Sequence, residues 1–406
     1  MPPDFSLYRS VTSMEPLLPE SGRGLLSELS AEIFRRSGEL TQRIPSPHVR
    51  REIARVVRGM NSYYSNLIEG HKTLPRDIER ALQQEFDSGS ERRRNQELSA
   101  AHVRTEITMR DRLRVEPALD AFSPDFIQWL HHEFYSHLPE DAWFTESEAG
   151  LQHPLTPGNL RGYVVQVGRH TPPEPTTLPA FLERFQQVYS DSRILATDRL
   201  ISLAAAHHRL AWIHPFGDGN GRVARLQTQA AMIRSGVDGE GLWTLSRGLA
   251  RQKQTYFSKL AGADAARGSD LDGRGNLSDR GLSEFCLFLL QTILDQMTFM
   301  VGLVAPFTLV ERIERYLGFV RTDLDETLRG RLSRLLRALH WEGEIPRGKV
   351  PELLGVKGTT ARDVIRQAVR EGLVTSDSEK RPLRIAFPDK VVEYYFPGLF
   401  TDLPVD

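Results

Sequence analysis

The sequence has a single cysteine, Cys286, and no segment that resembles a secretion signal. One thiol excludes an internal disulfide and a zinc site of several cysteines, and its apolar neighbours, FCLFLL, predict a buried side chain in a reducing compartment. The N-terminus, MPPDFSLYRS, lacks a cationic stretch followed by an apolar run. The most apolar stretch, residues 285 to 305, contains Gln291, Asp295 and Gln296, which favours a core helix over a membrane span. We therefore expect a soluble cytoplasmic protein.

The chain also has almost no net charge, because 52 lysines and arginines balance 53 aspartates and glutamates. This balance excludes a basic field over the whole protein that would attract nucleic acid or membrane, although one segment can still be basic. Neither GxxxxGK[ST] nor GxGxxG occurs, so two common phosphate-binding loops are absent. The length of 406 residues predicts two or three domains.

The densest group of chemically active residues is IHPFGDGNGRVAR, residues 213 to 225. Apolar residues at steps of three and four on both sides predict a helix, a glycine loop and a second helix. Arg222 and Arg225 fall in the first turn of the second helix, where the positive end of the helix dipole disfavours cations. Together with the backbone N–H groups of Gly219, Asn220 and Gly221, they predict a socket for a polyanion, and arginine favours a phosphate chain.

Two further residues of this loop suggest catalysis. Asp218 is the nearby carboxylate that can hold Mg²⁺ against phosphate oxygens. His214 stands at the other end of the loop and can take a proton from a nucleophile at neutral pH. The alternative is a tight interhelical turn in which these residues only cap the flanking helices.

HPFGDGNGRVAR resembles the signature of the Fic family, HxFx(D/E)GNGRxxR, at every defined position. The resemblance implies a mostly α fold with a helical core and a β-hairpin flap, and an enzyme that moves AMP from ATP to a Ser, Thr or Tyr hydroxyl of a protein. It implies that His214 is the base, Asp218 holds Mg²⁺, Gly219, Asn220 and Gly221 cradle the α-phosphate, and Arg222 and Arg225 hold the β- and γ-phosphates. The glycine after Asn220 is lysine in phosphate-transferring relatives, so its presence here favours nucleotidyl transfer.

Two more stretches resemble parts of that family. RGYVVQV, within residues 160 to 173, resembles the flap, whose strand would pair with an extended target segment; the residues concerned are Tyr163, Val164, Val165, Gln166 and Val167. RQKQTYFSKL resembles the helix beside the adenine, with Tyr256 as the ring that contacts the base. The alternatives are an ordinary structural hairpin and a core aromatic.

SNLIEG, residues 65 to 70, resembles the inhibitory motif [ST]xxxE[GN], with Ser65, Glu69 and Gly70 at its defined positions. Glu69 falls in the last turn of a predicted helix, where a carboxylate faces the negative end of the dipole. The resemblance supplies a partner, Arg225, and implies that their pairing takes the place of the γ-phosphate. We therefore expect an autoinhibited enzyme of the class with an N-terminal inhibitory helix.

Three domains are predicted: residues 1 to 117, with the inhibitory helix at about 48 to 70; a catalytic core at 118 to 305; and residues 306 to 406. The last region reads as three helices followed by two strands with a basic turn, which is the winged-helix order. Its cations could grip DNA phosphates, although acidic residues dilute them. The cations are Lys357, Arg362, Arg366, Arg370, Lys380, Arg381 and Arg384, and the acids are Asp363, Glu371, Asp377 and Glu379.

The leading hypothesis is an autoinhibited protein adenylyltransferase that uses ATP and Mg²⁺ and acts on a protein, which can be itself. One alternative is a DNA-binding transcriptional regulator with a nucleotide-sensing domain. Another is an enzyme that removes AMP, with Glu69 positioning water. The expected partners are ATP, a protein target, DNA through the winged helix, and a second copy in a homodimer, with no membrane.

Overall fold

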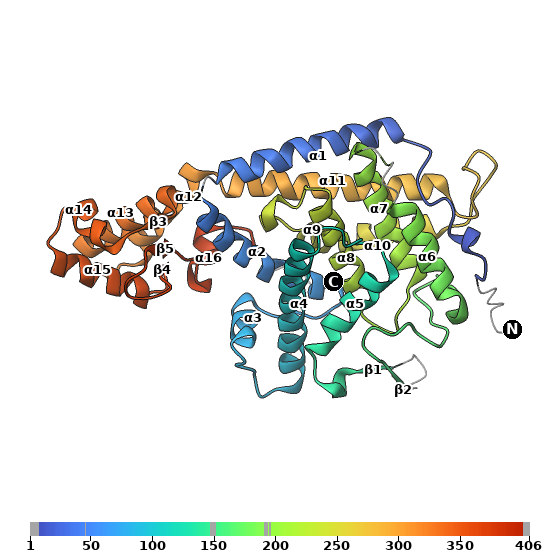
Figure 1. Ribbon diagram of the computed structural model, residues 1–406, viewed down its shortest axis with the longest axis horizontal. Helices are drawn as coiled ribbons and strands as arrows, with labels where there is room; N and C mark the ends of the chain where they lie inside the picture. The colour runs from blue at the N-terminus through green and yellow to red at the C-terminus, as the bar shows by residue number, and fades with distance from the viewer. Residues whose placement is uncertain (1–7, 45, 147–151, 191–193, 195, 401–406) are drawn as a thin grey trace. The chain divides into compact units, whose positions relative to one another are not determined.

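The computed structural model describes residues 8–44, 46–146, 152–190, 194 and 196–400 (Figure 1). These residues are mostly helical, so the predicted mostly α class is confirmed. The chain forms two compact units. The first unit contains residues 1–35, 61–238 and 245–296, and the second contains residues 36–60, 239–244 and 297–406.

Each of these two units is assembled from segments that are distant in the sequence, and the predicted domain boundaries at 117 and 305 stay predictions. Residues 36–60 belong with the C-terminal residues, so helix α2 (Pro47–Ile68) passes from the second unit into the first. Its apolar residues at steps of three and four, including Ile53, Met60 and Tyr64, are buried, as the periodicity predicts.

The helices of the first unit surround a central pair, α7 and α8. Helix α7 is buried along most of its length, and α8 is buried from Arg222 to Met232. Helix α5 begins with Ser123, whose hydroxyl accepts from Phe126 N at 3.2 Å, and with Pro124 at its first position, a common start signal. The α-helices lying wholly or partly in this unit are α1 (Arg23–Arg43), α2, α3 (Pro75–Leu82), α4 (Ser90–Val115), α5 (Pro124–Ser136), α6 (Leu178–Tyr189), α7 (Ala196–Ile213), α8 (Asn220–Arg234), α9 (Leu245–Arg251), α10 (Lys253–Asp264) and α11 (Asp279–Leu303). Short 3₁₀ helices are η1 (Val11–Met14), η2 (Glu140–Ala142) and η3 (Pro175–Thr177), and the second unit contains η4 (Gly239–Gly241).

Helix α11 is the one described helix that is long and apolar enough to cross a membrane, and it includes most of the stretch predicted as a core helix. Of its most apolar window, 61% is buried inside the fold. Its burial supports the core assignment, since a core helix passes the same test of length and hydropathy.

The strands of the first unit are not where the sequence predicts them. Strands β1 (Phe144–Glu146) and β2 (Gln152–Pro154) form an antiparallel pair in which Thr145 faces His153. The run Tyr163–Val167, predicted as a strand or hairpin, contains no named strand. It ends in one antiparallel bridge between Val167 and His170. The turn between them includes Gly168 at φ +59°, so the chain reverses before a ladder can form.

The second unit combines helices with a small antiparallel sheet. The sheet has the order β3–β5–β4, with Glu344 opposite Arg384 and Thr375 also opposite Arg384. Three helices and two strands follow one another in the predicted order; β3 and a final helix, α16, are additional. The assignment of this arrangement as a winged helix stays a prediction. The elements are α12 (Pro306–Arg315), a π-helix η5 (Tyr316–Val320), α13 (Glu326–Glu342), β3 (Glu344–Ile345), η6 (Arg347–Lys349), α14 (Val350–Leu354), α15 (Gly358–Arg370), β4 (Val374–Thr375), β5 (Leu383–Ile385) and α16 (Asp389–Tyr395).

Candidate active site

The loop between α7 and α8 is held in a fixed shape by its own residues. The Asn220 side chain accepts from Phe216 N at 2.9 Å and donates to Phe216 O at 2.9 Å. Gly219 has φ +77°, and a Cβ there would lie 2.9 Å from Tyr135 Cε2. Because the Asn220 oxygen and one of its two amide N–H groups are used inside the loop, the predicted contact with a phosphate is expected to rely on the backbone N–H groups at the start of α8 as well.

The imidazole of His214 is neutral. Its Nδ1 lies 3.3 Å from the carbonyl oxygen of Ala211. A carbonyl only accepts, so Nδ1 carries the hydrogen and Nε2 keeps the lone pair. Burial, with the charge of Arg161, lowers the pKa of His214 to about 4. The imidazole is therefore unprotonated at neutral pH, which is the state that a general base requires.

Arg161, which the sequence does not single out, joins the flap region to the loop. Its guanidinium donates to the carbonyl oxygens of His214 at 2.8 Å, Tyr163 at 2.9 Å and Pro173 at 2.7 Å. Arg161 is only 4% exposed. This residue fixes the backbone of His214 while the imidazole is left to the cavity.

Asp218 carries an ionised carboxylate at the other end of the loop. Tyr135 donates its hydroxyl to Asp218 Oδ2 at 2.7 Å. Burial opposes ionisation, but the charge of Arg222 and the hydrogen bond from Tyr135 outweigh it and lower the pKa of Asp218. His131 supports the loop from below, because its Nε2 lies 3.3 Å from Asp218 O and its ring stacks on Phe216 with centroids 4.0 Å apart.

The described residues contain no group of three or more His, Cys, Asp or Glu side chains that could hold a metal ion. Among the described residues there is thus no site at which protein side chains alone could surround a cation. Mg²⁺ commonly takes one or two carboxylates, with waters and substrate phosphates as its other ligands. The single carboxylate of Asp218 beside an anion site fits that limited role.

The C-terminal end of α2 binds both arginines of α8. Arg225 Nε donates to Ser65 Oγ at 2.9 Å, and its Nη2 donates to Ser65 O at 3.0 Å and to Glu69 Oε1 at 2.6 Å. Arg222 Nε donates to Asn66 Oδ1 at 3.0 Å. Ser65 and Asn66 are fully buried. The motif SNLIEG therefore supplies partners for both cations, and Asn66 is one that the sequence does not predict.

Glu69 lies directly over the start of α8. A Cβ added to Gly221 would be 2.3 Å from Glu69 Oε1, so the carboxylate rests against this glycine. Helix α8 has no side-chain cap at its N-terminus, which leaves its first N–H groups facing an anion. Burial raises the pKa of Glu69, but the charges of Arg225 and Arg222 outweigh it and the pKa is lowered. Gly70, at φ +88°, ends α2 immediately after Glu69.

A cavity of about 1010 Å³ in the first unit brings several predicted residues together. Its wall includes His214, Asn220, Gly221, Arg225, Glu69, Tyr256, Gln166 and Val167. Asp218, Gly219, Arg222 and the segment Tyr163–Val165 are not among its lining residues. The volume is at the upper end for small-molecule sites and is large enough for a nucleotide.

The cavity wall also includes apolar and aromatic residues from α10 and from the N-terminal segment. Phe257, Leu260 and Tyr8 line it, together with the carboxylate of Asp264. Tyr256 is only 2% exposed, and its hydroxyl lies 2.8 Å from His207 Nε2. Burial raises the pKa of Tyr256 to about 12. Tyr256 thus belongs to the core and also forms part of the wall where a base would lie.

Comparison with known proteins identifies one part of the chain. Residues 121–232 match the model of the Fic/DOC family. "Protein adenylyltransferase Fic" of Drosophila erecta is 37% identical over 112 residues, which cover 28% of this chain and 22% of that protein. "Protein adenylyltransferase fic-1" of Caenorhabditis elegans is 39% identical over 87 residues, 21% of this chain and 17% of that protein. The matched segment thus spans about a fifth of these relatives.

A solved structure of a Fic family protein from Desulfovibrio desulfuricans G20 is similar over most of the chain. It covers 91% of this chain and 98% of its own, with 17% sequence identity and a TM-score of 0.54. At this identity the similarity concerns the fold alone. The helical arrangement described above is therefore one that a Fic family protein adopts.

Proposed function

We propose that this chain, whose residues 121–232 match the Fic/DOC family model, is a protein adenylyltransferase that Glu69 holds inactive. The observation that carries the proposal is the ion pair between Glu69 Oε1 and Arg225 Nη2, 2.6 Å long, at the uncapped start of α8. It lies in the same cavity as the neutral imidazole of His214.

In the proposed reaction, ATP binds with its phosphates toward the start of α8 and its base toward Tyr256. The hydroxyl oxygen of a target protein attacks the α-phosphorus, the bond to the β-phosphate bridging oxygen breaks, and pyrophosphate leaves. His214 Nε2 takes the hydroxyl proton. The backbone N–H groups at the start of α8 and the guanidinium of Arg225 hold the negative charge, which is where most of the acceleration of such transfers arises.

Asp218 would hold Mg²⁺ when the ion is bound with the nucleotide, and the ion would supply positive charge to the phosphate oxygens. The hydrogen bond from Tyr135 to Asp218 orients the carboxylate.

The inhibited state follows from competition for Arg225. Glu69 occupies the place beside Gly221 and Arg225 that the terminal phosphates of ATP would take. Ser65 accepts from Nε and Nη2 of Arg225, and Glu69 also accepts from Nη2, so the carboxylate occupies a donor and a positive charge that the triphosphate would otherwise meet. Activation then requires Glu69 to move away or to be replaced.

The proposal is tested by incubating the wild type, Glu69→Gly and His214→Ala with labelled ATP and a cell lysate, followed by mass spectrometry for AMP adducts. We expect adducts with Glu69→Gly, few with the wild type and none with His214→Ala. The target, including this chain itself, is identified by the modified peptide. Equal labelling by the wild type and Glu69→Gly would contradict the inhibitory role.

Removal of AMP is distinguished in the same system. The side chain of Glu69 is 32% exposed and lines the cavity, so its carboxylate could also orient a water molecule. A pre-modified protein is supplied without ATP, and released AMP is measured. If the wild type releases AMP and Glu69→Gly does not, removal of AMP is the main activity and transfer of AMP is the minor one.

A further inference from the structure

The second unit exposes a basic face on helix α15. This helix turns small and apolar residues inward, and these are buried: Ala361, Val364, Ile365 and Ala368. Its outward side carries exposed residues at steps of three and four: Thr359, Arg362, Arg366 and Arg370. Lys357, just before the helix, is exposed as well. One face of α15 is thus polar and carries three arginines over about three helical turns.

The acidic residues near this face are largely neutralised by other partners. Glu371 pairs with Arg321 at 2.8 Å and with Lys390 at 2.6 Å. Asp363 pairs with Arg366 at 2.9 Å. In the described part of the chain, Arg362, Arg370 and Lys357 have no acidic partner. The sequence alone therefore overstates how far acidic residues reduce the positive charge of this face.

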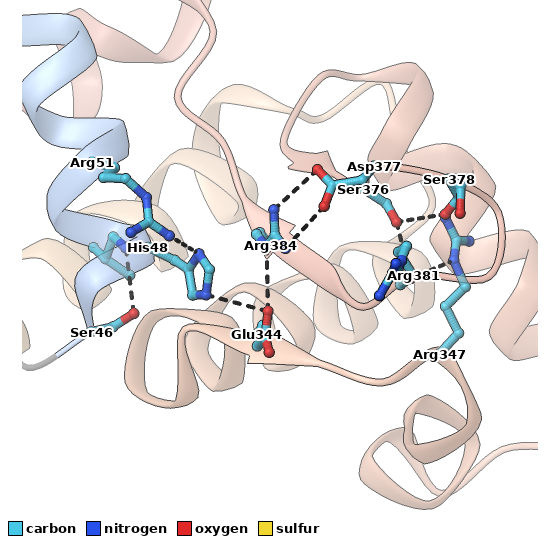
Figure 2. A network of polar contacts seen from close by, with 11 residues as sticks. Ser46, His48, Arg51, Glu344, Arg347, Ser376, Asp377, Ser378, Arg381 and Arg384 are labelled. Atoms are coloured by element: carbon cyan, nitrogen blue, oxygen red, sulfur yellow. Dashed lines mark hydrogen bonds and ion pairs between the residues drawn. The ribbon is translucent and has the colours of Figure 1, made fainter. Parts of the chain in front are cut away.

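A second group of cations lies on the turn between β4 and β5 (Figure 2). Arg384 is bound by Asp377 at 3.1 Å and by Glu344 at 3.3 Å, so this ion-pair network uses both carboxylates. Lys380 and Arg381 are exposed at the tip of the turn, and neither forms an ion pair among the described residues. Asp377 and Glu344 thus serve the base of the turn, while the tip carries Lys380 and Arg381 beside one exposed acid, Glu379, and keeps a net positive charge.

Hydrogen bonds hold the tip of this turn in place. The single hydroxyl hydrogen of Ser376 is shared between Ser378 O, 2.7 Å from Oγ, and Arg381 O, 3.0 Å from Oγ. Arg347 Nε donates to Arg381 O at 3.3 Å, which brings a further guanidinium beside the turn, as Figure 2 shows. The cations thus stand on an ordered backbone, so little conformational entropy is lost when they meet a ligand.

We propose that the second unit binds double-stranded DNA through a basic surface made of Lys357, Arg362, Arg366, Arg370, Lys380 and Arg381. An α-helix fits the major groove, and Arg and Lys are the side chains that most often contact phosphates and guanine edges. Helix α15 follows a short helix and a turn at Gly355, and it precedes a hairpin with a cationic tip, an order that places a helix in the groove and a turn on the flanking backbone. The interaction needs neither ATP nor His214.

An anionic membrane is the other polyanion that such a surface could meet. Binding to a membrane surface generally adds apolar side chains that insert between the lipids. On the described part of α15 the exposed large hydrophobic residue is Val369, at 44%, and the face is otherwise polar. The distribution of side chains therefore favours DNA.

The test measures fluorescence anisotropy of a labelled random-sequence duplex with the full-length protein, without ATP, between about 50 and 200 mM salt. Two surface variants are compared, Arg362→Ala/Arg370→Ala and Lys380→Ala/Arg381→Ala. The control, Arg92→Ala/Arg94→Ala, removes two exposed cations from α4 in the first unit. All six substituted side chains are exposed, so the fold should persist, and circular dichroism checks it.

We expect the wild type to bind with a steep salt dependence. Each lost phosphate contact lowers the slope of log K against log salt by about 0.9, so each surface variant should lose about 1.8 and bind at least about tenfold more weakly at low salt. The control should match the wild type. No binding by the wild type at about 50 mM salt, or an equal loss in the control, would overturn the proposal. Binding to phosphatidylserine vesicles but not to the duplex would overturn it in favour of a membrane. None of these outcomes bears on AMP transfer.

Discussion

Replacing Glu69 with glycine should raise the affinity of the protein for ATP by about 10- to 100-fold. The substitution removes the carboxylate that contacts Arg225 Nη2 at 2.6 Å and rests against Gly221. Glu69 follows the last residue of α2 and precedes Gly70, so a glycine there adds little strain. Arg225 keeps its two hydrogen bonds to Ser65, and one donor becomes available to a phosphate.

The magnitude follows from the contact that ATP must displace. A hydrogen bond to a charged group contributes about 1.5 to 3 kcal/mol, and each 1.4 kcal/mol is a factor of ten in affinity. The Arg225 side chain is 3% exposed and that of Glu69 is 32% exposed, so solvent screens the pair only in part. Glu69→Gln, which keeps the shape and loses the charge, should lie between the wild type and glycine.

Isothermal titration calorimetry with ATP and Mg²⁺ measures the effect. Glu116→Gly is a matched control: Glu116 also follows the last residue of a helix, α4, and pairs with an arginine, Arg112, at 3.2 Å, but it is not among the lining residues of the cavity. The control should bind ATP as the wild type does. Equal affinities of the wild type and Glu69→Gly would refute the competition between carboxylate and phosphate.

Four further outcomes are expected. His214→Ala should abolish AMP transfer while ATP still binds by calorimetry; retained transfer would remove His214 as the base. Because the pKa of Glu69 is lowered from 4.5, the pair with Arg225 is intact above that pH and is lost only as pH falls below it, so the ratio of wild-type to Glu69→Gly activity should be constant from about pH 6 to 8; a ratio that changes there would contradict the ion pair. Burial lowers the pKa of His102 and His131 to about 4. The unfolded state therefore binds more protons below pH 6.5, and urea unfolding should show about 1.4 kcal/mol less stability per pH unit for each histidine as pH falls toward 4; a flat profile would show that the two rings are hydrated. Finally, Gly248→Ala should lower the melting temperature, because its Cβ would lie 2.4 Å from Thr292 Cγ2 and overpacking costs about 1 to 3 kcal/mol, whereas Gly262→Ala, with nothing within 4 Å, should not lower it.

The sequence predicts the loop at residues 213–225 and its counterpart, Glu69, because both violate local electrostatics. Arg222 and Arg225 are cations at the start of a helix, and Glu69 is an anion at the end of another. Such misfits indicate partners elsewhere in the fold, and the structure brings Glu69 and Arg225 together although they are 156 residues apart. The positions of the helices follow from apolar periodicity. The end of α2 follows from Gly70.

Residues that act through tertiary contacts leave no such signal. Tyr135 reaches Asp218 across 83 positions, and Arg161 reaches His214 across 53. Neither residue is out of place in its own segment, so nothing local identifies it. The side chain of Asn220 is bound within the loop, and this use depends on how the loop closes.

The flap region shows why strand propensity is insufficient. The β-branched run Tyr163–Val167 has the composition of a strand, but a strand needs a paired neighbour. Here Arg161 takes the carbonyl of Tyr163, and the turn at Gly168 follows directly after Val167. A single bridge results. The charges of the second unit are a similar case, because composition cannot tell which acids, such as Asp377, already have a cationic partner.

Transfer of label from ATP distinguishes movement of AMP by this site from movement of the terminal phosphate. Glu69→Gly and Glu69→Gly/His214→Ala are each incubated with a target lysate and ATP labelled either at the α- or at the γ-phosphate. We predict that protein acquires label from α-labelled ATP only, and only with the single variant. Label from γ-labelled ATP, or label that persists when His214 is replaced, would contradict AMP transfer by this site.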